Sequence, residues 1–221
     1  MATERRAETS RLEGFSDAVF AFALTLLVVS LQVPSSYDEL VHTLRSFVAF
    51  APSFASLVWI WYLHREFFRR FGLGDGPMVS LNALLLFLVL LYVYPLKFLA
   101  TLVFGQVFDP ATTAPIQSDQ WAQLIAIYGL GYVAVFAVYI LMYLYVLRKR
   151  RELHLSRLDV FDARYAIEAN LINIGTGLGS IALAMLGAPP VVAGFFYLVL
   201  GPLRVLHRAR SGRHRPPAGA T

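Results

Sequence analysis

An apolar run close to the N-terminus restricts the folds open to this chain more than any other feature. It extends from Phe15 to Val33 and contains one ionisable residue, Asp17, near its start. As a helix, the run rises roughly 28 Å, about the thickness of a bilayer's hydrocarbon core. A carboxylate at the mouth of such a helix is expected to have a partner, because an unpaired charge is costly in lipid. The run is too long for the apolar part of a signal peptide and no small-residue cleavage site precedes Pro34, so we interpret it as a retained span.

Further apolar segments follow, and hydrophobic residues make up 57% of the 221 positions. This balance is too apolar for an ordinary soluble domain. We therefore expect an all-α integral membrane protein, with a single six-helix membrane domain over residues 1–221 and a disordered basic tail over about residues 211–221. We also expect a polar lead-in before residue 15, a short helix or loop over 35–44, and a polar, partly helical stretch before 164. The predicted spans are about residues 15–33, 47–68, 79–104, 121–147, 165–186 and 191–206.

Lysine and arginine are distributed very unevenly between the two ends of these spans. Of the 19 basic residues, 17 fall in segments that the span count places on one side. The positive-inside rule therefore places both termini in the cytoplasm, in a multi-pass protein of the cell membrane. The clusters lie where anionic lipid headgroups would be, so the net charge of +5 needs no nucleic-acid partner. The largest cluster comprises Arg148, Lys149, Arg150 and Arg151.

Few residues offer enzymatic or metal chemistry. The chain has no cysteine, which excludes disulfides and zinc–thiolate sites. Of the five histidines only His64 falls at membrane depth, where a structural role is usual. The glycine-rich run Gly175–Gly179 lies within a predicted span and follows no strand, so it indicates helix packing rather than phosphate binding. We expect no enzyme and no cofactor.

The first span carries an apolar stripe on one of its faces. At about 100° per residue, Asp17 points roughly 140° away from Phe22, and Thr25 lies about 60° from the centre of the stripe. The stripe either packs against neighbouring helices or forms a pore wall with a hydrophobic constriction, at which an ion must lose water. Its members are Phe15, Val19, Phe22, Leu26 and Val29.

The opening of the first span resembles the prokaryotic transmembrane-protein-175 family of potassium channels. The resemblance rests on the pattern R-x-x-x-F-S-D, formed by Arg11, Phe15, Ser16 and Asp17. Trp61 and His64 in the second span are similar to the family's Trp/His pair, and Asn82 in the third span to its asparagine. We interpret these motif residues as structural supports for the first helix, with Arg11, Ser16, Trp61 or His64 as candidate partners of Asp17.

This resemblance implies a homotetramer in which the first helix of each six-span subunit lines a central pore for potassium ions. The family's constriction is an aliphatic residue five positions after the motif aspartate, and a threonine three positions further contributes to selectivity. Those positions are Phe22 and Thr25 here, so the chain departs from the pattern at the constriction. Leu26 and Val29 would continue the lining.

Two other functions remain open from the sequence. A proton-coupled secondary transporter or proton leak pathway could use Asp17 or Glu168 as a proton carrier. Alternatively, a membrane scaffold without transport would use the stripe of the first span only as a helix interface.

Overall fold

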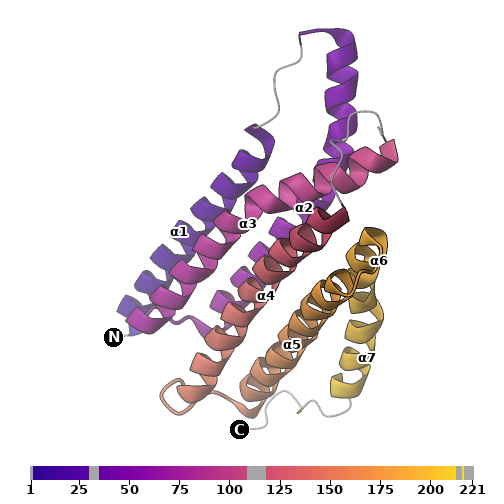
Figure 1. The fold of residues 1–221 in the computed structure, drawn as a ribbon. Coiled ribbons are helices and arrows are strands. Elements are labelled where there is room, and N and C mark those ends of the chain that lie inside the picture. Colours follow the sequence, from indigo (N-terminus) through magenta and orange to yellow (C-terminus); the bar gives the residue numbers. More distant parts are fainter. Residues whose placement is uncertain (1, 30–34, 109–117, 213–215, 217–221) are drawn as a thin grey trace. The chain divides into compact units, whose positions relative to one another are not determined.

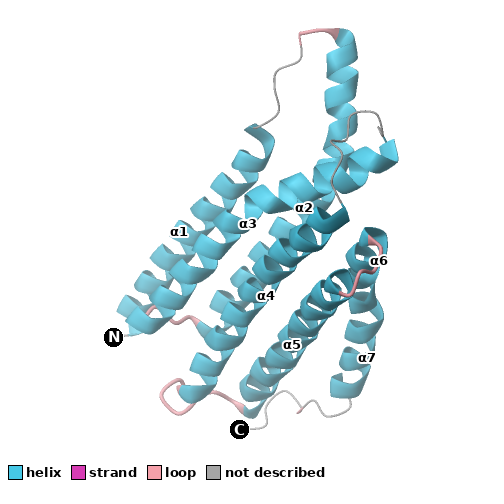
Figure 2. Cartoon of the chain, viewed as in Figure 1, coloured by secondary structure: helices cyan, strands magenta, loops and turns pink. Residues whose placement is uncertain are grey.

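Helices alone make up the regular structure of the described part of the chain. The computed structural model describes residues 2–29, 35–108, 118–212 and 216 (Figures 1 and 2). The chain divides into two compact units, Met1–Pro115 and Ile116–Thr221. The all-α class expected from the sequence is therefore observed. The first unit contains α1, α2 and α3, and the second contains α4 to α7.

Helix α1 (Ala2–Val29) begins well before the apolar run. The expected polar lead-in is thus part of the first helix. Thr9 is buried, and its hydroxyl donates to the carbonyl of Gly72 at 3.0 Å. Gly72 ends the next helix in a left-handed conformation (φ 53°), which leaves that carbonyl open to a side-chain donor. The last residues of the first predicted span, 30–33, lie outside the described residues.

Helix α2 (Tyr37–Phe71) is continuous where the sequence indicated a separate outer segment and a span. Its N-cap Ser36 accepts from the Glu39 amide, while the amide and hydroxyl of Ser35 donate to the Glu39 carboxylate at 2.6 and 2.7 Å. These bonds hold the pKa of Glu39 below its ordinary value. Pro52 lies inside the helix rather than at its start. Because proline removes one helical hydrogen bond, it accounts for the change of direction along α2 (Figure 1).

Helix α3 (Gly76–Phe108) also contains a proline, Pro95, and bends along its length (Figure 1). It packs against both α1 and α2. The buried side chains of this three-helix unit come from all three helices. They include Phe20 and Leu27 of α1, Leu57 and Phe67 of α2, and Leu85 and Val89 of α3.

In the second unit, α4 (Ser118–Arg148) packs along α5 (Arg157–Met185). The expected surface stretch after the arginine cluster is a set of turns that ends at Ser156. There a capping box starts α5: Ser156 accepts from the Asp159 amide, and the Asp159 carboxylate accepts from the Ser156 amide. This cap explains why α5 begins eight residues before the predicted span.

Glycine allows α4 and α5 to approach closely. A β-carbon placed on Gly177 would lie 2.8 Å from Val133 Cγ2 and 3.2 Å from Tyr132 Cδ1. Gly175, two residues earlier, has no such neighbour within 4 Å. The glycine-rich run therefore contributes to helix packing through specific positions.

The last predicted span is interrupted. It consists of α6 (Pro190–Phe195), a 3₁₀ turn η1 (Phe196–Val199) and α7 (Leu200–Gly212). Pro202 explains the interruption, because it lacks the amide hydrogen that an unbroken helix would donate to the carbonyl of Leu198. Helix α7 continues two residues into the predicted tail, whose residues 213–215 and 217–221 lie outside the described part.

Four helical segments among the described residues are long and apolar enough to cross a membrane. They are Gly76–Val93, Gln120–Arg148, Arg157–Met185 and the interrupted segment Pro190–Gly212. The chain is therefore a membrane protein with several apolar helices.

Candidate functional site

A buried chain of hydrogen bonds joins the three helices of the first unit. The Nδ2 group of Asn82 on α3 donates to the Ser16 hydroxyl on α1 at 2.9 Å. Ser16 donates in turn to the carbonyl of Leu12 at 2.8 Å. The Oδ1 atom of Asn82 lies 2.8 Å from Nε2 of His64 on α2, and because an amide oxygen only accepts, this nitrogen carries the hydrogen. One amide side chain thus links all three helices.

The imidazole of His64 is enclosed by aromatic rings. It is 1% exposed, and its centroid lies 5.5 Å from that of Phe20 and 4.6 Å from that of Phe68. Burial among rings makes a lost hydrogen bond expensive, because no water can replace Asn82. The network therefore fixes the angle of α1 against α2 and α3.

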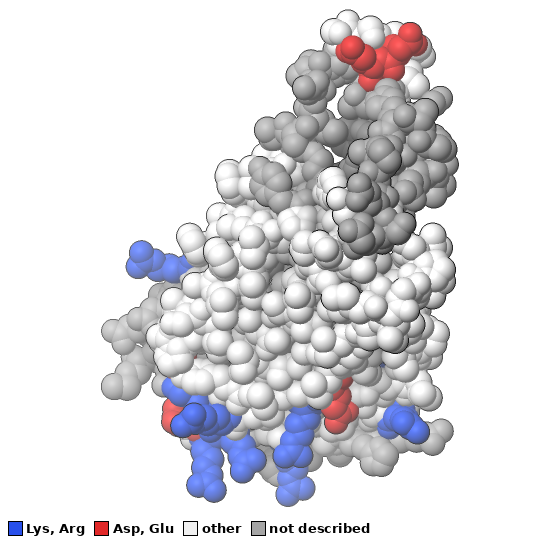
Figure 3. Space-filling view, in the orientation of Figure 1, with Lys and Arg blue, Asp and Glu red and all other residues white. Residues whose placement is uncertain are grey.

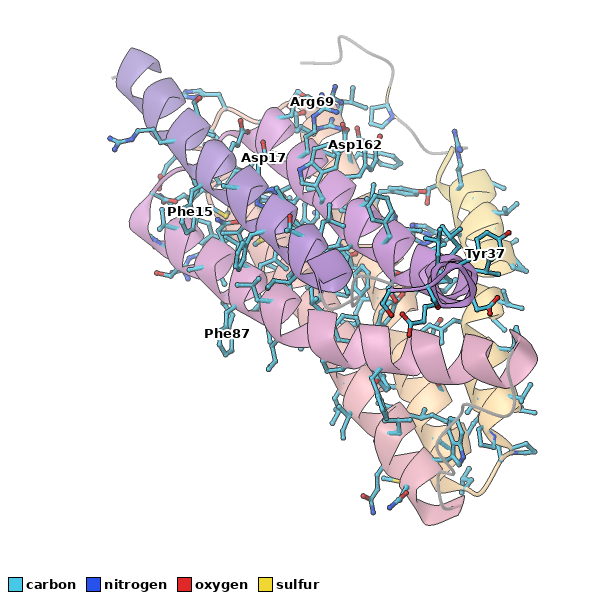
Figure 4. All side chains as sticks on the ribbon, turned by 90° about the horizontal axis from the view of Figure 1, so that it is seen from above. Phe15, Asp17, Tyr37, Arg69, Phe87 and Asp162 are labelled. Carbon is cyan, nitrogen blue, oxygen red and sulfur yellow. The ribbon has the colours of Figure 1, made fainter. Side chains whose placement is uncertain are left out.

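Asp17 has a partner on the neighbouring helix. The indole Nε1 of Trp61 donates to Oδ1 of Asp17 at 2.8 Å, and Asp17 lies on the side of α1 that faces α2 (Figure 4). The guanidinium of Arg65 lies over the Trp61 ring, 5.9 Å from its centroid. Glu13, one helical turn before Asp17, has its pKa raised by partial burial and by the nearby Asp17 carboxylate. Arg11, the remaining motif residue, is exposed on α1.

The opposite face of α1 is open. Phe15 is 62% and Phe22 58% exposed, whereas Phe20 and Leu27 on the other face are buried. Thr25 is exposed, and its hydroxyl donates to the carbonyl of Ala21 at 2.9 Å. The other members of the predicted stripe are less open or not described. Val19 and Leu26 are partly buried, and the side chain of Val29 lies outside the described residues.

The second unit contains a polar contact between two residues that were not expected from the sequence to be partners. The guanidinium of Arg204 on α7 donates to Oδ1 of Asn173, a fully buried residue of α5, at 3.0 Å. From the sequence, Arg204 was assigned only to the cluster of basic residues in the C-terminal segment. The signal for this contact was a basic residue inside the sixth predicted span and two asparagines, Asn170 and Asn173, inside the fifth.

A resident metal site is not evident in the described part of the chain. No three His, Asp or Glu side chains lie close enough there to hold an ion. Ser16, His64 and Asn82 instead bond to one another, as do Asp17 and Trp61, which suits these groups to hold helices in place.

These features define a class: an all-helical membrane protein whose first helix is anchored by polar bonds on one face and exposes aromatic side chains on the other. The profile of the family described as "Endosomal/lysosomal potassium channel TMEM175" matches residues 11–92, the segment that holds the network. A potassium channel of Marivirga tractuosa is 34% identical over 215 residues, covering 91% of this chain and 87% of that relative. The chain belongs to the TMEM175 family.

Other relatives and solved structures agree with this assignment. Potassium channel Cha6605_3372 of Chamaesiphon minutus is 37% identical over 103 residues, covering 43% of this chain and 51% of that relative. The crystal structure of a threonine-to-alanine variant of the potassium channel MtTMEM175 superposes with a TM-score of 0.79 at 33% identity, covering 92% and 93% of the two chains. A structure from Chamaesiphon minutus, described as a lysosomal potassium-selective channel TMEM175 homolog, gives a TM-score of 0.61 at 26% identity, covering 93% and 98%.

Proposed function

We propose that this protein is a potassium-permeable channel in which the exposed face of α1 lines the ion pathway. The observation that carries the proposal is the division of α1 into two faces. One face is tied to α2 and α3 by Ser16 and Asp17, and the other presents Phe22 and Thr25 to the outside of the unit. Relatives similar to this chain are named potassium channels.

The chemistry of the exposed face supports a hydrophobic constriction. Phe22 offers no oxygen to an ion, so a ring of these side chains would control passage through the cost of removing water. Thr25 stands one turn further on. Its hydrogen is used by the carbonyl of Ala21, which leaves the hydroxyl lone pairs available to a cation. Leu26 and Val29 continue the lining beyond Thr25.

The proposal requires several copies of the chain, because one α1 helix cannot enclose a pathway. We place four copies around a central axis as a homotetramer, each copy forming one membrane domain of six spans. Both termini lie in the cytoplasm of a cell-membrane protein. In support, α2 by itself has acidic residues in its first turn, Asp38 and Glu39, and basic residues in its last turn, Arg69 and Arg70. In the second unit, basic side chains gather at the end where α4 gives way to α5 (Figure 3). The arginine clusters would contact anionic lipid heads.

Replacement of Phe22 tests the proposal directly. The full chain with Phe22→Ala is reconstituted in liposomes, and potassium, sodium and caesium flux is measured. We expect a higher potassium flux and a changed ion preference, because the smaller side chain widens and wets the constriction. Phe87→Ala is the matched control, since Phe87 is 61% exposed and projects away from α3 (Figure 4).

The outcome separates the three candidate functions. Unchanged conductance and selectivity in Phe22→Ala would remove Phe22 as the constriction. Flux that saturates and requires a pH gradient would favour a proton-coupled transporter or leak. Vesicles that hold their potassium gradient would favour a scaffold without transport.

A further inference from the structure

A histidine near the end of the chain lies between two hydrogen-bond acceptors. His207 of α7 packs against α5, where its Nε2 lies 3.4 Å from the backbone carbonyl of Tyr165. Its Nδ1 lies 3.7 Å from the carboxylate of Glu168. The histidine side chain is 12% exposed and that of Glu168 is 62% exposed. Neither contact belongs to the network of the first unit.

The two neighbours match one protonation state of the ring. A neutral imidazole has one N–H donor and one acceptor nitrogen, whereas the protonated ring has two donors. A carbonyl oxygen and a carboxylate only accept. In the neutral state one ring nitrogen therefore faces an acceptor without a hydrogen to offer, and protonation corrects the mismatch.

We propose that His207 is a proton-binding site that fastens α7 to α5 when the pH on its side of the membrane falls. The protonated ring satisfies the Tyr165 carbonyl and forms an ion pair with Glu168. The ring of Tyr165 adds to this preference, because it stacks on the imidazole with centroids 4.5 Å apart and an angle of 12°, and an aromatic face favours a cation.

The other charged and titratable groups near the ring define its electrostatic surroundings. Helix α7 packs on α5 and η1, whose charged and titratable residues are Arg157, Asp159, Asp162, Arg164, Tyr165 and Glu168 on α5 and Tyr197 on η1. On α7 itself, Arg204 lies one turn before His207, Arg208 follows it, and Arg210 lies one turn after it. Arg204 donates a hydrogen bond to Asn173.

The position of His207 gives the proton a structural effect. Helix α7 follows the 3₁₀ interruption, so its first turn is not held by an unbroken helix from α6. Its contacts with α5 then determine how firmly it is held. Protonation of His207 adds one such contact, about one helical turn after Arg204 on α7.

Hydrogen exchange of the full chain in nanodiscs tests the proposal at pH 6 and pH 8, a range in which imidazole side chains titrate. Rates are corrected for the intrinsic pH dependence of exchange. We expect the protection of α7 amides, relative to those of α4, to rise about two- to fivefold at pH 6, the size of an exposed ion pair. His207→Gln should abolish this rise.

Two further variants complete the experiment. Glu168→Gln keeps the shape of an exposed side chain but removes its charge, so it should reduce the rise without unfolding the chain. His154→Asn is the control, because His154 is exposed in the α4–α5 turn (φ 49°) and asparagine accepts that conformation. A wild-type chain without the pH 6 increase, or a His207→Gln chain that retains it, would overturn the proposal.

Discussion

The side chain of Asn82 links three helices of this membrane protein. It is 1% exposed and serves both as donor to Ser16 and as acceptor from His64. Because the three residues lie on three helices, each bond also fixes an orientation. A leucine has the same branching but a larger side chain, and it could make neither bond.

We expect Asn82→Leu to destabilise the chain by about 1–3 kcal/mol, because the His64 Nε2–H would be left buried without its acceptor. Thermal unfolding in detergent measures the change. Ser80→Ala is the matched control on the same helix, since Ser80 is exposed and its hydroxyl bonds only to the Gly76 carbonyl in the recorded contacts. If the two variants unfold at the same temperature, the network does not hold the helices in place.

The residues of this network could be named from the sequence, but their bonds could not. The R-x-x-x-F-S-D pattern singled out Ser16 and Asp17, and the resemblance added Trp61, His64 and Asn82. Several partners were open for Asp17, because helix periodicity does not fix how two helices are rotated against each other. The structure gives Trp61 as a partner of Asp17, and Asn82 as the residue that joins Ser16 to His64.

Among the helices, the pairing of α4 with α5 depends on where glycine stands. We expect Gly177→Ala to destabilise the second unit by about 1–3 kcal/mol, because its new methyl would meet Val133 and Tyr132 and overpack the interface. Thermal unfolding of the two single variants measures the effect.

Gly175→Ala provides the comparison within the same helix. Its methyl would meet no atom within 4 Å, so the better helix propensity of alanine should leave stability unchanged or raise it by up to about 1 kcal/mol. Equal losses in both variants would show that backbone freedom, rather than close packing, requires glycine in this run.

The predicted helix boundaries agree with the structure where apolarity alone determines them. They differ from it where a cap or a proline determines where a helix begins or ends. The Ser156 cap and the Thr9 contact extend α5 and α1 beyond their apolar cores. Hydropathy does not detect such local bonds. Pro202 was visible in the sequence, but a 3₁₀ turn before it depends on how the flanking segments pack against α5.

For the whole chain, the uneven distribution of lysine and arginine predicts which ends of the helices face the cytoplasm, and this prediction can be tested. The chain has no cysteine, so single cysteines can be introduced without background labelling. Tyr37→Cys and Leu186→Cys should react with a membrane-impermeant maleimide added outside intact cells, since both positions are exposed near predicted outer ends.

His154→Cys, in the turn after the arginine cluster, should react only after the cells are permeabilised. Labelling of His154→Cys from outside, with the other two positions protected, would contradict the cytoplasmic termini while keeping the span count. Labelling of all three positions from the same side would contradict the span count.

The exposure of Phe22 has a consequence for how such a protein can diversify. A residue that its own helix bundle does not enclose can change size without disturbing the core that keeps the chain folded. The bore of the proposed conduit and the integrity of the subunit are thereby under separate control. Descendants of one scaffold could exchange an aliphatic for an aromatic side chain here and inherit the same architecture.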